Sequence, residues 1–264
     1  MAVRMPLAGP FVLLDDARAD GAPARLYQHP SAIISATCLA EVQPALARLR
    51  AAVADGAHAA GFLAYEAGAA FEPQAGAHDT CPTPLLWFGL FDTCRHVPAV
   101  PSLLPDPAGA WVGAPEPGVS REHYDATLRQ VLDLIAAGDI YQANLTFRAT
   151  ARVLGDPLAL YAAVRQRAGA GWGAIVATGA DTFLSFSPEL FFSLQGDALR
   201  CRPMKGTARR DADPARDAAS AGALATDAKQ RAENLMIVDL IRNDLSRVAT
   251  PGSVKVPELF AIEA

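Results

Sequence analysis

Residues 182–207 are TFLSFSPELFFSLQGDALRCRPMKGT, and this stretch decides the fold class. Residues 183–186 and 189–194 are strand-like, with an interruption at Ser187 and Pro188, and the returning strand is expected over residues 199–205, after the pair Gly196-Asp197. Turn residues between two strand-like runs predict an antiparallel hairpin. The sequence therefore indicates antiparallel sheet rather than an all-helical chain.

The loop length of this hairpin decides which side chains share a face. If the loop holds residues 196–198, Glu189 lies opposite Lys205, whereas a two-residue loop places Glu189 opposite Met204 and turns Lys205 to the other face. In both registers the two backbones are neighbours. A carboxylate and an amine on one sheet could serve as a general acid and a lysine nucleophile, or could form a salt bridge at the rim.

The residues around Lys205 favour an anionic substrate. Arg202 supplies bidentate donors for a carboxylate, Gly206 lets the backbone approach a ligand closely, and Thr207 adds a hydroxyl group. Neither G-x-x-x-x-G-K-[ST] nor G-x-G-x-x-G occurs in the chain, which argues against a nucleotide site.

A second polar cluster follows a predicted helix that begins after Ser120 and ends at Gly138. Apolar and hydrogen-bonding residues alternate over residues 140–148, which predicts a strand with two different faces. The hydrogen-bonding face suits a pocket for a small anion, although a face wetted by solvent has the same pattern. Its members are Gln142, Asn144, Thr146 and Arg148.

A further helix is expected within residues 229–248, with Asp227 and Gln230 forming its N-terminal box. Its apolar residues are too many for one face, so we expect it to be buried on most sides. Glu233 and Asp244 fall on one stripe of this helix, and buried carboxylates need partners. The candidates are a Mg²⁺ ion for Glu233, with Asp244 structural, or the arginines at 231, 242 and 247.

The composition is that of a soluble globular protein. The chain has 264 residues, 51% apolar and 19% charged, with a net charge of −5, which argues against nucleic acid and anionic membranes as partners. Its four cysteines form no C-x-x-C pair, and no uncharged apolar run reaches the 18 or more residues that span a bilayer. These features predict a cytoplasmic protein.

Six prolines lie between residues 98 and 117, a composition that predicts a connection between two parts. We expect an N-terminal scaffold half over 1–97, a proline-rich connection over 98–118 and a catalytic region over 119–264. Within the scaffold half, strands are predicted at 32–34, 61–65 and 85–91 and a helix at 42–54. Together these elements predict an α+β fold with antiparallel or mixed sheets and helices packed outside.

Four motifs together resemble the chorismate-utilising enzymes, strongly over residues 120–264 and more weakly over residues 1–97. They are GDIYQANLT at 138–146, SFSPE at 185–189, RPMKGT at 202–207 and RAENLMIVDLIRNDL at 231–245. In the N-terminal half, LLDD at 13–16 and GFLAYEAG at 61–68 look like the scaffold part of the subgroup that aminates chorismate.

The resemblance implies that the 4-hydroxyl group of chorismate is replaced by ammonia, delivered by a glutamine amidotransferase subunit, on the 4-aminobenzoate and folate pathway. It assigns Lys205 as the nucleophile, Glu189 as the general acid and Glu233 as a Mg²⁺ ligand. It also favours the three-residue hairpin loop, because acid and nucleophile must both reach the ring. Gln142, Asn144, Thr146, Arg202, Gly206 and Thr207 would bind substrate.

Two positions distinguish the subgroups. Relatives that form anthranilate carry alanine in place of Lys205, and relatives that form isochorismate carry lysine in place of Gln142. An anthranilate-forming enzyme is the alternative activity. Since family members extend further than Ala264, the resemblance also implies a fold incomplete at its C-terminus, and a fragment that only binds is a second alternative.

Overall fold

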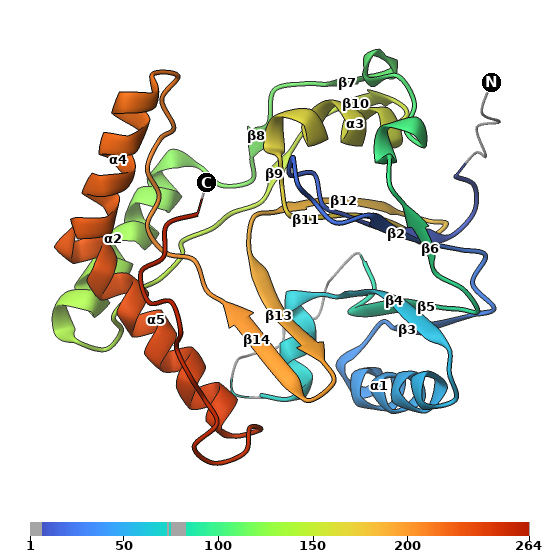
Figure 1. Cartoon of the computed structure of the whole chain (residues 1–264), viewed down its shortest axis with the longest axis horizontal. Helices are drawn as coiled ribbons and strands as arrows, with labels where there is room; N and C mark the ends of the chain where they lie inside the picture. Colours follow the sequence, from blue (N-terminus) through green and yellow to red (C-terminus); the bar gives the residue numbers. More distant parts are fainter. Residues whose placement is uncertain (1–6, 73, 75–82, 264) are drawn as a thin grey trace. The chain divides into compact units, whose positions relative to one another are not determined.

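The computed structural model describes residues 7–72, 74 and 83–263 (Figure 1). The chain divides between Phe186 and Ser187 into two units, which are described separately. The structure confirms the predicted α+β class, because antiparallel sheets and helices both occur. Residues 98–118, the predicted connection, lie inside the first unit and form short elements there.

The main sheet of the first unit is built around the apolar strand β1 (Phe11–Asp15), which pairs antiparallel with β11 on one side and β2 on the other. Leu13 lies opposite both Ile175 and Leu26, and all three side chains are buried. The strand order is β12, β11, β1, β2, β6. The other strands of this sheet are β2 (Ala24–Gln28), β6 (Arg95–Val97), β11 (Trp172–Ala177) and β12 (Thr182–Ser187).

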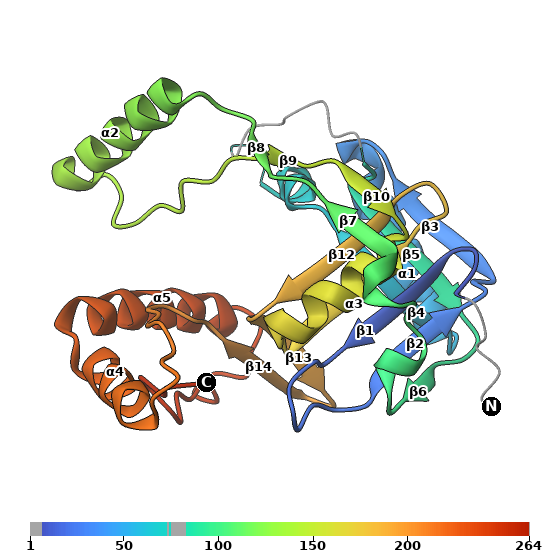
Figure 2. The ribbon, with the colours of Figure 1, turned by 90° about the horizontal axis from the view of Figure 1, so that it is seen from above.

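A three-stranded sheet forms the rest of the scaffold, in the order β3, β5, β4 (Figure 2). Its strands are β3 (Ala32–Ala36), β4 (His58–Leu63) and β5 (Leu86–Phe91), which confirms the three strands predicted here. The helix α1 (Leu39–Ala54) packs on it through Val42, which is completely buried. The short helix η1 (Tyr65–Ala70) joins the same core through Ala67.

A buried ionic cluster joins the main sheet to the helix α3 (Pro157–Ala168). Asp15 at the end of β1 accepts hydrogen bonds from the Tyr161 hydroxyl group at 3.0 Å and from Arg165 Nε and Nη2 at 2.6 and 3.0 Å. Burial and the neighbouring Asp15 raise the pKa of Tyr161, and the hydrogen bonds from Arg165 to Asp15 raise the pKa of that guanidinium. This cluster fixes α3 against the sheet.

Short elements complete the first unit. They are η3 (Val100–Ser102), η4 (Pro107–Gly109), β7 (Ala110–Val112), β8 (Glu116–Pro117), β9 (Ala149–Thr150) and β10 (Val153–Gly155). Strand β7 pairs with β10, and β8 pairs with β9. The chain between β8 and β9 leaves the sheets, forms the helix α2 (Arg121–Ala137) and returns (Figure 2).

Helix α2 begins and ends where the sequence predicts. The Ser120 hydroxyl group accepts a hydrogen bond from the His123 N–H at 3.2 Å, and Gly138 ends the helix with φ of 82°. The strand predicted over residues 140–148 is wrong, because this segment has no regular structure before β9. A strand needs a neighbour for its backbone groups, and no described segment pairs with residues 140–148.

The second unit contains the hairpin of β13 (Leu190–Gln195) and β14 (Ala198–Arg202). Gln195 pairs with Ala198, so the loop has the two residues Gly196 and Asp197, and the favoured three-residue loop is wrong. The pairs Leu190 with Arg202 and Ser193 with Arg200 show one extra residue in β13, which is a bulge. The bulge shifts the register by one residue between Ser193 and Leu190, and Glu189 lies directly before the paired part of β13.

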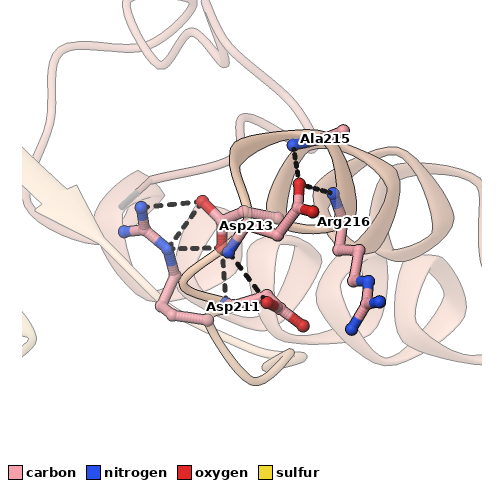
Figure 3. A network of polar contacts seen from close by, with 6 residues as sticks. Asp211, Asp213, Ala215 and Arg216 are labelled. Atoms are coloured by element: carbon pink, nitrogen blue, oxygen red, sulfur yellow. Dashed lines mark hydrogen bonds and ion pairs between the residues drawn. The ribbon is translucent and has the colours of Figure 1, made fainter.

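Two capped helices follow the hairpin. Asp213 begins α4 (Pro214–Thr226): its carboxylate accepts hydrogen bonds from the Ala215 and Arg216 N–H groups at 2.8 and 3.4 Å, and its own N–H donates to Asp211 (Figure 3). Asp227 begins α5 (Ala228–Ser246) by accepting from the Gln230 N–H at 2.8 Å, as predicted.

The expectation that α5 is buried on most sides is wrong. No residue of α5 is buried, and the side chains of Leu235 and Leu240 are 50% and 55% exposed. An apolar helix is buried only when other elements pack around it. Among the described residues, α4 is the helix that contacts α5.

Within the described residues, Cys38, Cys94 and Cys201 are free thiols, and Cys81 lies outside that part of the chain. Burial raises the pKa of the Cys201 thiol. No helix in the described ranges is long and apolar enough to cross a bilayer.

Candidate functional site

A hydrogen bond links the Glu189 side chain to the segment that carries Lys205. The Met204 N–H donates to Glu189 Oε1 at 2.8 Å, one residue before Lys205 in the chain. A tight turn holds Glu189 in this place, because the Ser187 hydroxyl group donates to the Glu189 carbonyl at 3.0 Å and accepts from its N–H at 3.2 Å. The structure thus explains why Ser187 precedes the acid by two residues.

Lys205 is half-buried on the segment that follows β14. No ion pair involves it among the described residues, in contrast to Lys229, whose amine lies 3.9 Å from a Glu233 carboxylate oxygen. The alternative of a rim salt bridge between Glu189 and Lys205 is therefore not formed. An amine without a carboxylate partner is available to react with a substrate.

Gly206 is required by the backbone that follows Lys205. Its φ is +79°, a left-handed conformation that side chains rarely adopt, and a Cβ atom there would lie 2.8 Å from Gln230 Oε1 of α5. The sequence suggested that this glycine lets a ligand approach. In the structure the close neighbour is α5, so Gly206 allows the Lys205 loop to approach that helix.

The other substrate-binding candidates of the second unit are exposed. Arg202 forms an ion pair with Glu263 near the last described residue, and its side chain is 43% exposed. Thr207 is also exposed. The carboxylate that Arg202 pairs with in the structure is therefore that of Glu263, and its binding of substrate stays a prediction.

Gln142, Asn144 and Thr146 lie in the first unit, on the irregular segment before β9. No hydrogen bond from these three side chains is found among the described residues, so they can bind a ligand. Arg148, which shared their predicted face, instead pairs with Glu66 of η1: Arg148 Nη2 lies 3.0 Å from Glu66 Oε1. Of the four side chains on the predicted polar face, three therefore make no hydrogen bond among the described residues, and Arg148 is paired with Glu66.

Residues 9–264 match the family of chorismate binding enzymes. The chain belongs to this family. Aminodeoxychorismate synthase component 1 of Klebsiella aerogenes is 46% identical over 145 residues, which are 55% of this chain and 32% of that protein.

Two further comparisons agree with this membership. The component 1 of Salmonella typhimurium is 37% identical over 228 residues, which are 78% of this chain and 50% of that protein. The chain therefore spans between 32% and 50% of these curated relatives. The structure of anthranilate synthase component I from Streptococcus pneumoniae has a TM-score of 0.65, covers 94% of this chain and 64% of its own, and at 18% identity supports the fold alone.

Glu233 is the candidate metal ligand predicted from the sequence. Its side chain is 33% exposed, and its ion-pair partner is Lys229 rather than one of the three arginines considered from the sequence. Arg242 pairs with Asp239 at 3.1 Å, and the Arg231 guanidinium lies 4.2 Å from the Phe260 ring centroid. No group of three carboxylate, imidazole or thiol side chains that could hold a metal occurs in the described ranges.

A single carboxylate such as that of Glu233 fits only a metal site whose other ligands are water and substrate oxygen atoms. Mg²⁺ usually keeps several waters and takes one or two carboxylates together with oxygen atoms of the substrate. Glu233 fits such a shared site, whereas the described residues do not form a site made entirely of protein ligands.

Sequence reasoning missed Glu66 and the Asp15 cluster. Glu66 stands in the quoted stretch 61–68, but nothing in that stretch indicates that its partner is 82 residues away. Asp15 had a signal that could have been used, because a carboxylate directly after four apolar strand residues needs a buried partner.

Proposed function

We propose that this chain carries the reactive groups for replacing the 4-hydroxyl group of chorismate by ammonia, with formation of 4-amino-4-deoxychorismate. The observation that supports this most directly is the hydrogen bond from the Met204 N–H to Glu189, because it links the proposed acid to the residue directly before Lys205, for which no ion pair is found among the described residues. Membership in the chorismate binding family and the relatives named component 1 support the same substrate.

The proposed reaction uses two residues in turn. Lys205 Nζ forms a bond to the substrate ring while the C–O bond of the 4-hydroxyl group breaks, and Glu189 gives its proton so that the group leaves as water. Ammonia then forms the new C–N bond as the bond to Lys205 breaks, and its surplus proton returns to the Glu189 carboxylate. A glutamine amidotransferase partner would supply the ammonia.

The remaining candidates bind rather than react. Gln142, Asn144 and Thr146 would hold the polar groups of chorismate, and Arg202 and Thr207 would bind a carboxylate. Mg²⁺, held by Glu233 and by substrate oxygen atoms, would offset the negative charge of a substrate carboxylate. Gly206 gives the backbone the turn that Lys205 requires.

The test is an assay with chorismate, Mg²⁺ and excess ammonium, in which products are identified by mass spectrometry. We expect ammonium-dependent 4-amino-4-deoxychorismate and its loss in Lys205→Ala. Lys255→Ala is the matched control, since Lys255 is an exposed lysine of the same unit. The Lys205 peptide should also gain the mass of the substrate adduct when ammonium is omitted.

Glu189→Gln separates acid chemistry from structure. Its amide oxygen can still accept the Met204 N–H, but the side chain cannot give a proton in place of the acid. We expect the rate to fall about 10²- to 10⁴-fold while the fold is kept. Anthranilate as the product, or full activity of Lys205→Ala, would contradict the proposal.

A further inference from the structure

Glu66 and Arg148 form an ion pair between two segments that are far apart in the sequence. Arg148 Nη2 lies 3.0 Å from Glu66 Oε1, across 82 residues of chain. The two side chains differ in exposure: Glu66 is 23% exposed and Arg148 is 76% exposed. The pair therefore has a half-buried acidic member and an exposed basic member.

The acidic member stands on a rigid part of the first unit. Glu66 belongs to η1, where the adjacent Ala67 has 0% exposure in the core beneath α1. The Gln43 side chain of α1 also donates a hydrogen bond to the Ala70 carbonyl at the end of η1, at 2.9 Å. The packing of η1 thus holds Glu66 in place, and the long side chain of Arg148 extends to it.

The basic member ends the segment that carries Gln142, Asn144 and Thr146. Contacts of this segment gather at the same end: the Gly118 N–H donates to the Arg148 carbonyl at 2.7 Å, and the Phe147 ring lies edge-on to Tyr124 with centroids 5.7 Å apart. The three polar side chains themselves make no hydrogen bond in the described structure. The segment is therefore held by contacts of Phe147 and Arg148, which follow the proposed substrate-binding residues, and not by hydrogen bonds of those residues themselves.

We infer that Glu66 is a positioning residue, which acts through Arg148 to hold residues 142–146 in place for chorismate. This inference rests on the proposed function for its substrate. It also changes the role of Arg148, which the polar pattern would assign to the ligand. Because Arg148 pairs with a half-buried carboxylate of η1, it acts as a tether, and the neutral amide and hydroxyl groups are left to contact the substrate.

The first test measures how firmly the segment is held. Chymotrypsin cleaves after Tyr141 and Phe147, and cleavage after Phe191 of β13 serves as the internal reference. In Glu66→Gln we expect cleavage at the first two sites to be about two- to fivefold faster, the range that an exposed ion pair supports. Glu72→Gln, an exposed carboxylate close to η1, is the matched control and should change nothing.

The reversed pair, Glu66→Arg with Arg148→Glu, tests whether the two residues act together. It should restore the cleavage rates to within about twofold of those of the unaltered chain, because the attraction is re-formed with opposite signs. Each single reversal should speed cleavage more than Glu66→Gln, since like charges then face each other. Circular dichroism confirms that every variant is folded.

The second test is the chorismate assay with the same variants. A positioning role predicts a KM for chorismate about two- to fivefold higher in Glu66→Gln with kcat nearly unchanged, and recovery of KM in the reversed pair. A purely structural role would lower kcat through the active fraction and leave KM alone, and this result would overturn the inference.

Equal cleavage rates in all variants would overturn it as well. If the unaltered chain forms no product, the proposed function fails, and the cleavage rates still decide whether Glu66 holds the segment.

Discussion

Replacing Asp15 by alanine removes the acceptor at the centre of the first unit. The Asp15 side chain is 1% exposed and holds Arg165, whose side chain is 16% exposed, through two hydrogen bonds of 2.6 and 3.0 Å. The Tyr161 hydroxyl group donates the third bond, at 3.0 Å. Alanine leaves a buried guanidinium and a buried hydroxyl group without this acceptor.

The expected loss of stability in Asp15→Ala follows from the burial of the groups that it leaves unpaired. Three hydrogen bonds to a charged group contribute about 1.5–3 kcal/mol each before costs are counted, and part of this is offset because the carboxylate no longer has to be desolvated. Removing one member of a buried ion pair costs about 3–5 kcal/mol net. Since domains of this size are stable by about 5–15 kcal/mol, Asp15→Ala should lose a large part of the free energy of unfolding.

Urea unfolding followed by tryptophan fluorescence measures this loss. All three tryptophans, Trp87, Trp111 and Trp172, lie in the first unit, so the signal reports that unit. Asp125→Ala is the matched control, because Asp125 pairs with Arg121 at 2.8 Å on exposed α2 and should cost only about 0.5 kcal/mol.

Asp15→Asn keeps the shape of the side chain and gives a second measurement if the alanine variant does not fold. We expect it to cost about 1–3 kcal/mol, because its amide can still accept one bond but places N–H groups against the guanidinium. A loss below about 1 kcal/mol in both Asp15 variants, equal to that of the exposed control, would refute the reasoning that the buried cluster stabilises this unit.

Two further predictions concern the second unit. Gly206→Ala should cost about 1–3 kcal/mol from the left-handed backbone, with added crowding against Gln230, and should lower the chorismate turnover rate; a variant that is fully active and as stable in urea would contradict this. Hydrogen bonds from Arg210 lower the pKa of Asp217, so the stability that this carboxylate contributes is present above about pH 4 and is lost as pH falls through its lowered pKa. Asp217→Asn should therefore reduce the urea midpoint at pH 7 and flatten its dependence on pH below about 4. Identical pH profiles of the two chains would show that the pair does not stabilise the folded state.

Local signals in the sequence were sufficient for the helix ends. Ser120 and Gly138 stand where α2 begins and ends, and Asp227 stands where α5 begins. These positions depend on hydrogen bonds and backbone angles within a few residues, so no tertiary information is needed to place them.

The hairpin register shows where local reasoning ends. The turn residues Gly196 and Asp197 were evident, but the bulge at Phe191 and Phe192 was not, and it shifts the register of β13 against β14 by one residue. A bulge depends on how the two strands pair and twist along their length. The correct contact, from the Met204 N–H to Glu189, follows from that pairing.

The sequence also did not determine whether α5 is buried. The apolar run of α5 indicates a helix that can be buried, yet its exposure depends on which other elements surround it, and Leu240 is 55% exposed. The alternation over residues 140–148 likewise describes side chains suited to a strand, while a strand forms only beside a partner.

The amino-acid sequence was sufficient to predict both ends of α2, the start of α5, the α+β class and the motifs of the chorismate binding enzymes. Tertiary structure alone decided the pairings of Asp15 with Arg165 across 150 residues and of Glu66 with Arg148 across 82. The physical reason is that a capping bond depends on neighbours in the sequence, whereas an ion pair across the fold depends on the path of the whole intervening chain.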